Sequence, residues 1–249
     1  MKIVVCVKRV PDTETRVRLG SSGTDLDPSG VKFVVGPYEE FALEAALRLK
    51  ESGGAEQVQV LSLGDASTAE TLRQALAMGA DTAVLLEGTP VADGLETAKA
   101  LAATLKESDA ELVLFGVKAI DDDQQQVGPM VATLLSRPCA TAVSSFELVE
   151  GGVRCRREVE GGTELVDLPF PAVVSMTKGP YEPRYPSLKG IMAAKKKPLE
   201  QKPAPALSPR LVVDELSLPP ERPAGRVVGN GVEAVPELVR LLREEAKVL

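Results

Sequence analysis

The sequence predicts an α/β fold built on a doubly wound, mostly parallel sheet, with added antiparallel hairpins and an extended C-terminal arm. Three observations support this prediction. Short runs rich in β-branched residues alternate with helical patterns through the first half of the chain. Two Gly-Gly pairs then separate short, partly alternating runs, and the chain after Lys197 is rich in proline. Strands that alternate with helices form parallel βαβ units with right-handed crossovers.

The first half of the chain contains strand and helix signals in regular succession. Residues 2–10, KIVVCVKRV, form a nearly continuous apolar run, which is typical of a strand buried on both faces. Residues 37–52 carry apolar side chains at helical spacing, and Gly53 and Gly54 predict the end of that helix. Strand patterns follow at residues 56–64, 81–88 and 110–116, and helical patterns lie between them at 67–79 and 91–108.

Two of the predicted helices have recognisable start signals. Ser67 and Glu70 have the spacing of a capping box, and Gly79 is expected to end the helix that follows. Pro129 limits the start of the next helix, because a proline in a helix interior costs about 3 kcal/mol. We therefore expect that helix to begin near Gln126, with apolar side chains facing the core at Val127, Met130, Val131, Leu134 and Leu135.

The second half of the chain has a different residue pattern, with Gly-Gly pairs and then many prolines. The Gly-Gly pairs within residues 140–176 predict antiparallel hairpins. Eight of the 19 prolines lie between Pro198 and Pro236, before a short terminal helix. This segment is either a disordered tail or an ordered arm on another surface, and its apolar residues favour the arm. We expect an α/β domain over residues 1–197 and an arm with its helix over 198–249.

Composition argues against several classes of protein. The net charge of −7 and the pI of about 5.0 do not favour nucleic-acid binding. No apolar run reaches the roughly 18 residues of a membrane-spanning helix, and the N-terminus indicates a first strand rather than a signal peptide. The chain has no histidine, which removes His-based triads, and its 3 cysteines are far apart, which argues for a reducing compartment and against a zinc site.

The stretch from Gly116 to Met130, GVKAIDDDQQQVGPM, follows a predicted buried strand. The free amides at the start of the next helix, around Gln126, Val127 and Gly128, could attract a phosphate. The aspartates at 121–123 could instead cap that helix or ligate a cation, and they would repel a phosphate unless they point elsewhere. The residues alone leave a solvated loop, a nucleotide site and a metal site open. Neither G-x-G-x-x-G nor a Walker A motif occurs.

A second notable stretch, residues 179–200, combines large apolar residues with lysines, although the chain as a whole is acidic. It contains Tyr181, Tyr185, Leu188, Ile191 and Met192, followed by Lys195, Lys196 and Lys197. The lysines are either a solvated helix end or part of a docking surface. An apolar anchor beside a basic cluster suits transient docking to an acidic partner.

Five segments together resemble the β subunit of electron transfer flavoprotein: VKRVPD, GPYEEFALEAALRLKE, TLRQALAMGAD, GVKAIDDDQQQVG and EPRYPSLKGIMAAKKK. The resemblance covers nearly the whole chain. It implies a sheet of the adenine-nucleotide-binding type in an electron-carrier subunit that is not itself an enzyme. It also implies a heterodimer in which an α subunit binds most of the FAD and this subunit holds a structural AMP. Since the flavin supplies the redox chemistry, the absence of histidine fits this implication.

The resemblance further implies a route for the electrons. They would come from dehydrogenases, such as the acyl-CoA dehydrogenases of fatty acid oxidation, and pass toward a membrane quinone reductase. The expected compartment is the cytoplasm of a bacterium or archaeon, or the mitochondrial matrix of a eukaryote, although no transit peptide is seen. No nucleic acid, membrane insertion or metal is expected.

Carried over by position, the resemblance implies a set of site residues. The AMP pocket would comprise Cys6, Gly36, Pro37, Tyr38, Glu39, Leu63, Gly116, Ala119, Asp121, Asp122, Gln126, Val127 and Gly128. Tyr38 would also reach the flavin across the subunit interface. A partner-recognition loop over residues 181–197 would dock the dehydrogenase through Tyr185, Leu188, Ile191, Met192, Lys195, Lys196 and Lys197, with Leu188 as the anchor. The arm would embrace the α subunit.

Two departures from the family pattern concern the pocket. The family commonly has Asn at the position of Gly36 and Thr at that of Val127. In electron-bifurcating relatives a second FAD replaces AMP in this pocket. The resemblance therefore leaves open whether AMP or FAD is bound here. A stand-alone nucleotide-binding regulatory module also stays open. An ATP-cleaving ligase or thiolase is disfavoured, because VKRVPD stands where an S-G-G-x-D-S loop would be needed.

Overall fold

The computed structural model describes residues 1–89, 91–221 and 224–249. Pro90 and two residues of the expected arm, Arg222 and Pro223, lie outside the described residues. The chain divides into two compact units, Met1–Glu215 and Leu216–Leu249. Each unit is described separately.

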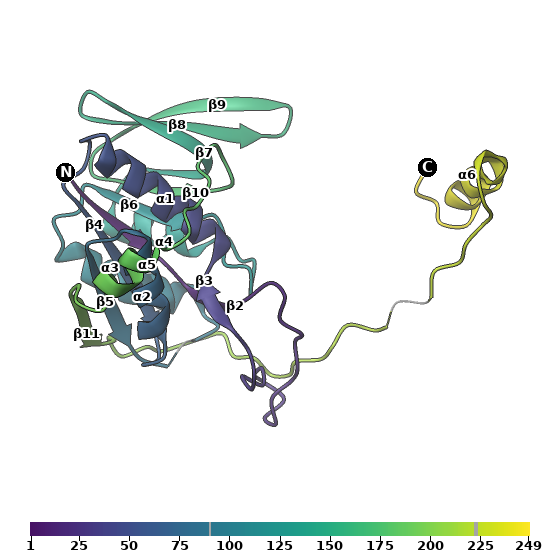
Figure 1. The fold of residues 1–249 in the computed structure, drawn as a ribbon, viewed down its shortest axis with the longest axis horizontal. Helices are drawn as coiled ribbons and strands as arrows, with labels where there is room; N and C mark the ends of the chain where they lie inside the picture. Colours follow the sequence, from purple (N-terminus) through teal and green to yellow (C-terminus); the bar gives the residue numbers. More distant parts are fainter. Residues whose placement is uncertain (90, 222–223) are drawn as a thin grey trace. The chain divides into compact units, whose positions relative to one another are not determined.

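The first unit is built on a sheet that has nine strands in the described part of the chain, in the order β11-β5-β4-β1-β6-β10-β7-β8-β9. Neighbours from β11 to β7 run parallel, whereas the β7–β8 and β8–β9 pairs are antiparallel. The β8–β9 ribbon extends from one end of the sheet, and β11 forms the opposite edge (Figure 1). The predicted α/β class and the added hairpins are therefore confirmed.

Apart from β11, which the sequence analysis did not predict, the strand bounds follow the sequence patterns closely. They are β1 Lys2–Cys6, β4 Gln57–Gly64, β5 Thr82–Glu87, β6 Leu112–Gly116, β7 Cys139–Val149, β8 Gly152–Val159, β9 Gly162–Pro169, β10 Ala172–Met176 and β11 Leu199–Pro203. The apolar run at residues 2–10 is not one strand. After β1 it continues into β2, Arg9–Pro11, which pairs with β3, Phe33–Val35, in a separate two-stranded sheet.

Helices cover both faces of the main sheet. They are α1 Pro37–Glu51, α2 Thr68–Met78, α3 Gly94–Lys106, α4 Val127–Leu135 and α5 Leu188–Ala194. Successive side chains of β1 alternate between two cores, as the pleat requires. Ile3 and Val5 pack in the core formed with α1 and α2, whereas Val4 and Cys6 pack in the core formed with α3 and α4. This is the doubly wound arrangement that the sequence predicts.

Most helix ends agree with the sequence signals, but one predicted start signal and one expected core residue do not. Helix α4 begins at Val127, immediately after Gln126, as expected. The capping box is wrong, because the backbone N–H of Ser67 donates to Asp65 Oδ1 at 2.9 Å and its hydroxyl donates to the same oxygen. The Ser67 side chain is thus occupied and does not cap α2. Leu134 was expected in the core but is 39% exposed.

The beginning of the expected arm belongs to the first unit. Strand β11 lies in the sheet beside β5, and the compact unit continues to Glu215. Backbone amides then bind the start of α3: the N–H of Ser208 donates to Glu96 Oε2 and that of Arg210 to Asp93 Oδ2, both at 2.8 Å. Residues 198–215, which the sequence analysis assigned to the arm, are therefore packed on their own chain.

The second unit contains a 3-10 turn, η1 Val232–Ala234, and the terminal helix α6, Val235–Glu244, that the sequence predicts. Arg240 forms ion pairs with Glu237 and Glu244 along α6, at 2.7 and 2.9 Å. The apolar residues Val235 and Leu238 of α6 are 50% and 43% exposed. Within the described ranges, none of the helices has the length and apolar character needed to cross a lipid bilayer.

Candidate functional site

A pocket lies at the carboxyl ends of the central strands β1, β4 and β6. Strand β1 sits between the other two, because the chain builds β4 and β5 on one side of it and then returns to β6 on the other. Ligands of doubly wound folds bind at such a switch point. The pocket contains about 850 Å³ of space not filled by atoms, part of it open to solvent.

The structure brings most of the expected nucleotide residues to this pocket. Its lining includes Cys6, Glu39, Leu63, Gly116, Ala119, Asp122, Gln126, Val127 and Gly128. The others stand next to it. A Cβ at Gly36 would lie 2.1 Å from Glu39 Oε2, a Cβ at Gly116 would lie 2.9 Å from the Tyr38 Cβ, and Asp121 pairs with Lys8. Pro37 begins α1 between Gly36 and Tyr38.

Other lining residues were not anticipated. They are Val7, Lys8, Val91, Ala92, Gly94, Thr97, Leu101 and Phe115. Val117, Lys118, Gln124 and Gln125 also line the pocket, and they belong to the stretch 116–128 that the sequence analysis singled out. The lining residues on α3 form a wall of the pocket that no motif indicates. The residues after β1 and β6 could have been found from one rule, namely that they follow the carboxyl ends of adjacent parallel strands.

The loop before α4 presents free backbone amides to the pocket. Asp123 and Gln125 have positive φ angles of 53° and 57°, a conformation that non-glycine residues rarely adopt and that clusters at functional sites. In the described chain, the Gln126 side chain makes no capping hydrogen bond to the first turn of α4. The amides of Val127 and Gly128 remain available at the positive end of the helix dipole, which favours an anion.

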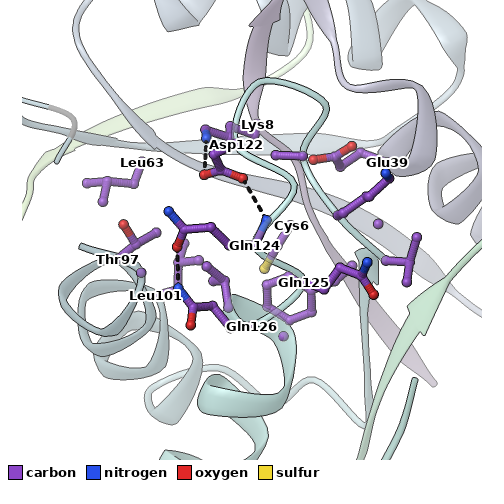
Figure 2. A pocket seen from close by; sticks show the side chains of 18 of the residues that line it. Cys6, Lys8, Glu39, Leu63, Thr97, Leu101, Asp122, Gln124, Gln125 and Gln126 are labelled. Carbon is purple, nitrogen blue, oxygen red and sulfur yellow. Dashed lines mark hydrogen bonds and ion pairs between the residues drawn. The ribbon is translucent and has the colours of Figure 1, made fainter. Parts of the chain in front are cut away.

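The three aspartates do not cap α4. Lys8 Nζ lies 2.9 Å from Asp122 Oδ2 (Figure 2). It lies at the same distance from Asp121 Oδ1, and Lys118 Nζ lies 2.9 Å from Asp123 Oδ2. Burial alone would lower the pKa of Lys8, but Asp121 and Asp122 outweigh burial and raise it. The carboxylates are thus turned toward cations, which reduces their repulsion of a phosphate.

The metal interpretation of this stretch finds no support in the arrangement of the side chains. Across the residues that the structure describes, no group of three or more His, Cys, Asp or Glu side chains is placed to hold a metal ion.

Glu39 is the one acidic side chain of the pocket wall that is almost fully buried. It is 5% exposed, and its Oε2 atom has no hydrogen-bond partner among the described residues. Burial raises the pKa of Glu39 to about 8, despite a hydrogen bond from its own backbone and the charge of Lys8. Figure 2 shows Glu39 on the same side of the pocket as Lys8 and Asp122, across from Leu101 and Gln126.

The expected docking residues lie on one exposed segment around α5. Tyr185, Leu188 and Met192 are 95%, 79% and 59% exposed, and Ile191, Lys195 and Lys196 are also exposed. Lys197 departs from the expectation. Its ammonium donates to the carbonyl oxygens of Leu76 and Ala80 at 2.9 and 2.6 Å, at the end of α2. We therefore assign Lys197 a structural role and keep the others in the docking set.

Two contacts fix the docking segment to the body of the unit. The Arg184 guanidinium contacts Glu44 at 2.7 Å and Glu51 at 2.5 Å, both on α1. On the other side, α5 approaches α2 so closely that a Cβ at Gly190 would lie 2.4 Å from the Ala77 carbonyl oxygen. The segment that carries Leu188 thus contacts both α1 and α2.

Comparison with known proteins places the chain in a family. The family model described as the electron transfer flavoprotein domain matches residues 25–207. The electron transfer flavoprotein subunit beta of Bradyrhizobium diazoefficiens is 41% identical over 249 residues, covering 100% of both chains. The chain belongs to the electron transfer flavoprotein beta-subunit family.

Other relatives of the same name extend this similarity. The subunits beta of Bacillus subtilis and Sus scrofa are 36% and 38% identical, each over 100% of this chain and 100% and 99% of their own. The family assignment supports electron transport as the role of this flavoprotein subunit. It argues against the stand-alone regulatory module and against the ligase or thiolase.

Proposed function

We propose that this chain is the β subunit of a heterodimeric electron transfer flavoprotein, with a structural AMP in the pocket at the switch point. The free amides at the start of α4, which lie beside the pocket at the carboxyl ends of β1, β4 and β6, carry the proposal. Val127 and Gly128 would hold the phosphate through their N–H groups, so the missing Thr hydroxyl at position 127 does not abolish the site. The apolar walls, including Leu63 and Leu101, would hold the adenosine moiety.

The nucleotide is tested by heating the purified chain and identifying what is released by chromatography. Stoichiometric AMP is the expected result. Stoichiometric FAD from this chain alone would instead indicate the electron-bifurcating type, in which the second flavin takes this pocket. A chain that releases no nucleotide and rebinds none would contradict the proposal.

The proposed α subunit would bind most of the FAD near the interface between the subunits. FAD supplies the one-electron and two-electron chemistry when it is bound. This chain would help to position the flavin and would not take part in its chemistry. Tyr38 would reach the flavin, and the C-terminal segment would wrap around the α subunit. The exposed apolar residues of that segment, such as Val227 at 84% and Val232 at 83%, suit burial against a partner.

The heterodimer is tested by co-purification of a tagged chain with an untagged α subunit from the same source. A yellow complex with one flavin per pair is expected. A colourless chain that never retains the α subunit would reject the carrier role.

The electron donors would be dehydrogenases, including acyl-CoA dehydrogenases, and the acceptor a membrane quinone reductase. Leu188 is the proposed anchor, since it is exposed beside Ile191 and Met192 and ahead of two free lysines. An apolar anchor with a basic rim gives a transient, salt-sensitive contact.

We expect Leu188→Ala to slow electron transfer from the dehydrogenase while flavin content stays constant. Leu165→Ala is the matched control, because Leu165 is 65% exposed but lies on β9, outside the docking segment. Stopped-flow kinetics compares the two variants. Equal rates for both would reject the docking role of Leu188.

A further inference from the structure

The pocket wall contains a buried acid whose role the proposed function does not explain. Glu39 lies in the first turn of α1, and only 5% of the residue is exposed to solvent. Most buried side-chain oxygens have hydrogen-bond partners, and each exception needs an explanation. In the described structure Glu39 Oε2 has none, although the residue lines the pocket.

Two glycines make room for this carboxyl group. A Cβ at Gly36 would lie 2.1 Å from Glu39 Oε2, and a Cβ at Gly116 would lie 2.9 Å from the same atom. Any side chain at either position would displace the carboxyl group. The sequence analysis noted that the family commonly has Asn at position 36, and here the glycine coincides with a glutamate three residues later.

Three charged groups face Glu39: Lys8 lowers the pKa of its carboxyl group, whereas Asp121 and Asp122 raise it. Lys8 follows β1, and Asp121 and Asp122 lie in the loop after β6. The ammonium of Lys8 is shared between those two carboxylates, so this group of three carries a net charge of −1. If Glu39 were ionised, the net charge of the four groups would be −2, beside the site proposed for a phosphate. A neutral carboxylic acid avoids this repulsion and provides an O–H donor.

We propose that Glu39 is a hydrogen-bond donor of the nucleotide pocket: held as a neutral acid between Gly36 and Gly116, it donates its O–H to an acceptor atom of the bound AMP. The proposal rests on the proposed function, since it takes AMP as the ligand. Loss of the proton removes the donor and adds a negative charge beside an anion. Both changes weaken binding, so AMP affinity falls as the pH rises.

The test measures AMP binding to the full-length chain by calorimetry at pH 7 and pH 9. The AMP phosphate, with a second pKa near 6, is a dianion at both values. If only protonated Glu39 binds well and its pKa is about 8, the Kd of the wild type rises about tenfold between the two. Glu39→Gln, which cannot ionise, is expected to have a pH 9 to pH 7 ratio near one, whatever its absolute affinity.

Glu40→Gln is the matched control, since Glu40 is the next residue on α1 but does not line the pocket. It should keep the wild-type ratio. A second measurement covers the case in which Glu39→Gln does not fold. At pH 8, calorimetry of the wild type in two buffers of different ionisation heat should show uptake of about half a proton per AMP bound.

The outcomes separate this inference from the proposed function. AMP binding that is equally tight at pH 7 and pH 9, without proton uptake, overturns the role of Glu39 and leaves the AMP site standing. Failure of the wild type to bind AMP at either pH overturns the site itself. A purified chain that retains AMP through gel filtration at pH 7 and releases it at pH 9 supports the inference.

Discussion

Arg184 is the residue that best shows how a buried charge can position an exposed surface. Glu44 on α1 is 2% exposed, and it binds both Arg184 and Arg48, at 2.7 and 2.8 Å. Burial would raise the pKa of Glu44, but the two guanidinium groups outweigh it and lower the pKa. An acid in this position depends on its partners, because an unpaired buried charge is costly.

We expect Arg184→Ala to destabilise the chain by roughly 2–3 kcal/mol, which is less than total loss of a buried partner because Arg48 remains. Arg154→Ala removes an equally direct pair with Asp167, but both of those side chains are exposed and screened by solvent, so we expect a clearly smaller loss. Urea unfolding of both variants checks the difference. Equal losses would show that the Glu44 pair is not special.

Glu39 predicts a pH dependence of stability as well as of binding. Its pKa in the folded chain, about 8, lies above the ordinary value of 4.5, so the folded state holds the proton more tightly. The stabilisation is complete below pH 4.5 and is lost between 4.5 and about 8, at up to about 1.4 kcal/mol per pH unit.

Wild type and Glu39→Gln are therefore compared by urea unfolding from pH 5 to pH 9. The variant should gain stability relative to the wild type as the pH rises, and the difference should level off above pH 8. A difference that does not change with pH would show that Glu39 ionises normally in the folded chain.

At the scale of single elements, α5 depends on a close helix contact. Gly190→Ala would place a Cβ 2.4 Å from the backbone oxygen of Ala77, and a backbone atom cannot move aside easily. We expect a loss of roughly 1–3 kcal/mol and slower electron transfer from the dehydrogenase, because α5 must shift away from α2. Lys189→Ala, at an exposed position of the same helix, serves as the control in thermal unfolding.

Helix α4 shows which parts of an element the sequence could predict. Its start followed from Pro129, a local constraint that acts within one turn. The pairing of Lys8 with Asp121 could not be predicted, because the two residues are 113 positions apart and only the sheet brings them together. The capping box at Ser67 failed for another reason: Asp65, two residues earlier, competes for the same hydroxyl.

At the scale of the whole molecule, the alternation of strands and helices sufficed to predict the doubly wound sheet. It did not predict β11, because Leu199–Pro203 has the proline and charge of a linker and owes its conformation to β5. The burial of Glu39 could not be predicted from the sequence either. Sequence spacing indicates a helix surface, whereas burial here depends on Gly36 and Gly116 from two other segments.

The division of the chain predicts the result of two truncations. A chain ending at Glu215 should keep its fold and its AMP, since the compact unit is complete, but should lose affinity for the α subunit. A chain ending at Lys197 also loses β11, which exposes the edge of β5, and should unfold at lower temperature. Thermal unfolding and co-purification distinguish the two. Full α-subunit binding by the first truncation would reject the role of residues 216–249.

Asp93 joins features that were described separately. One oxygen of its carboxylate accepts the Leu95 N–H at the start of α3, and the other accepts the Arg210 N–H, both within 2.9 Å. Gly94, the very next residue, belongs to the pocket lining. Asp93 therefore connects the rim of this pocket with the segment around Arg210, so a substitution of this one carboxylate would release both.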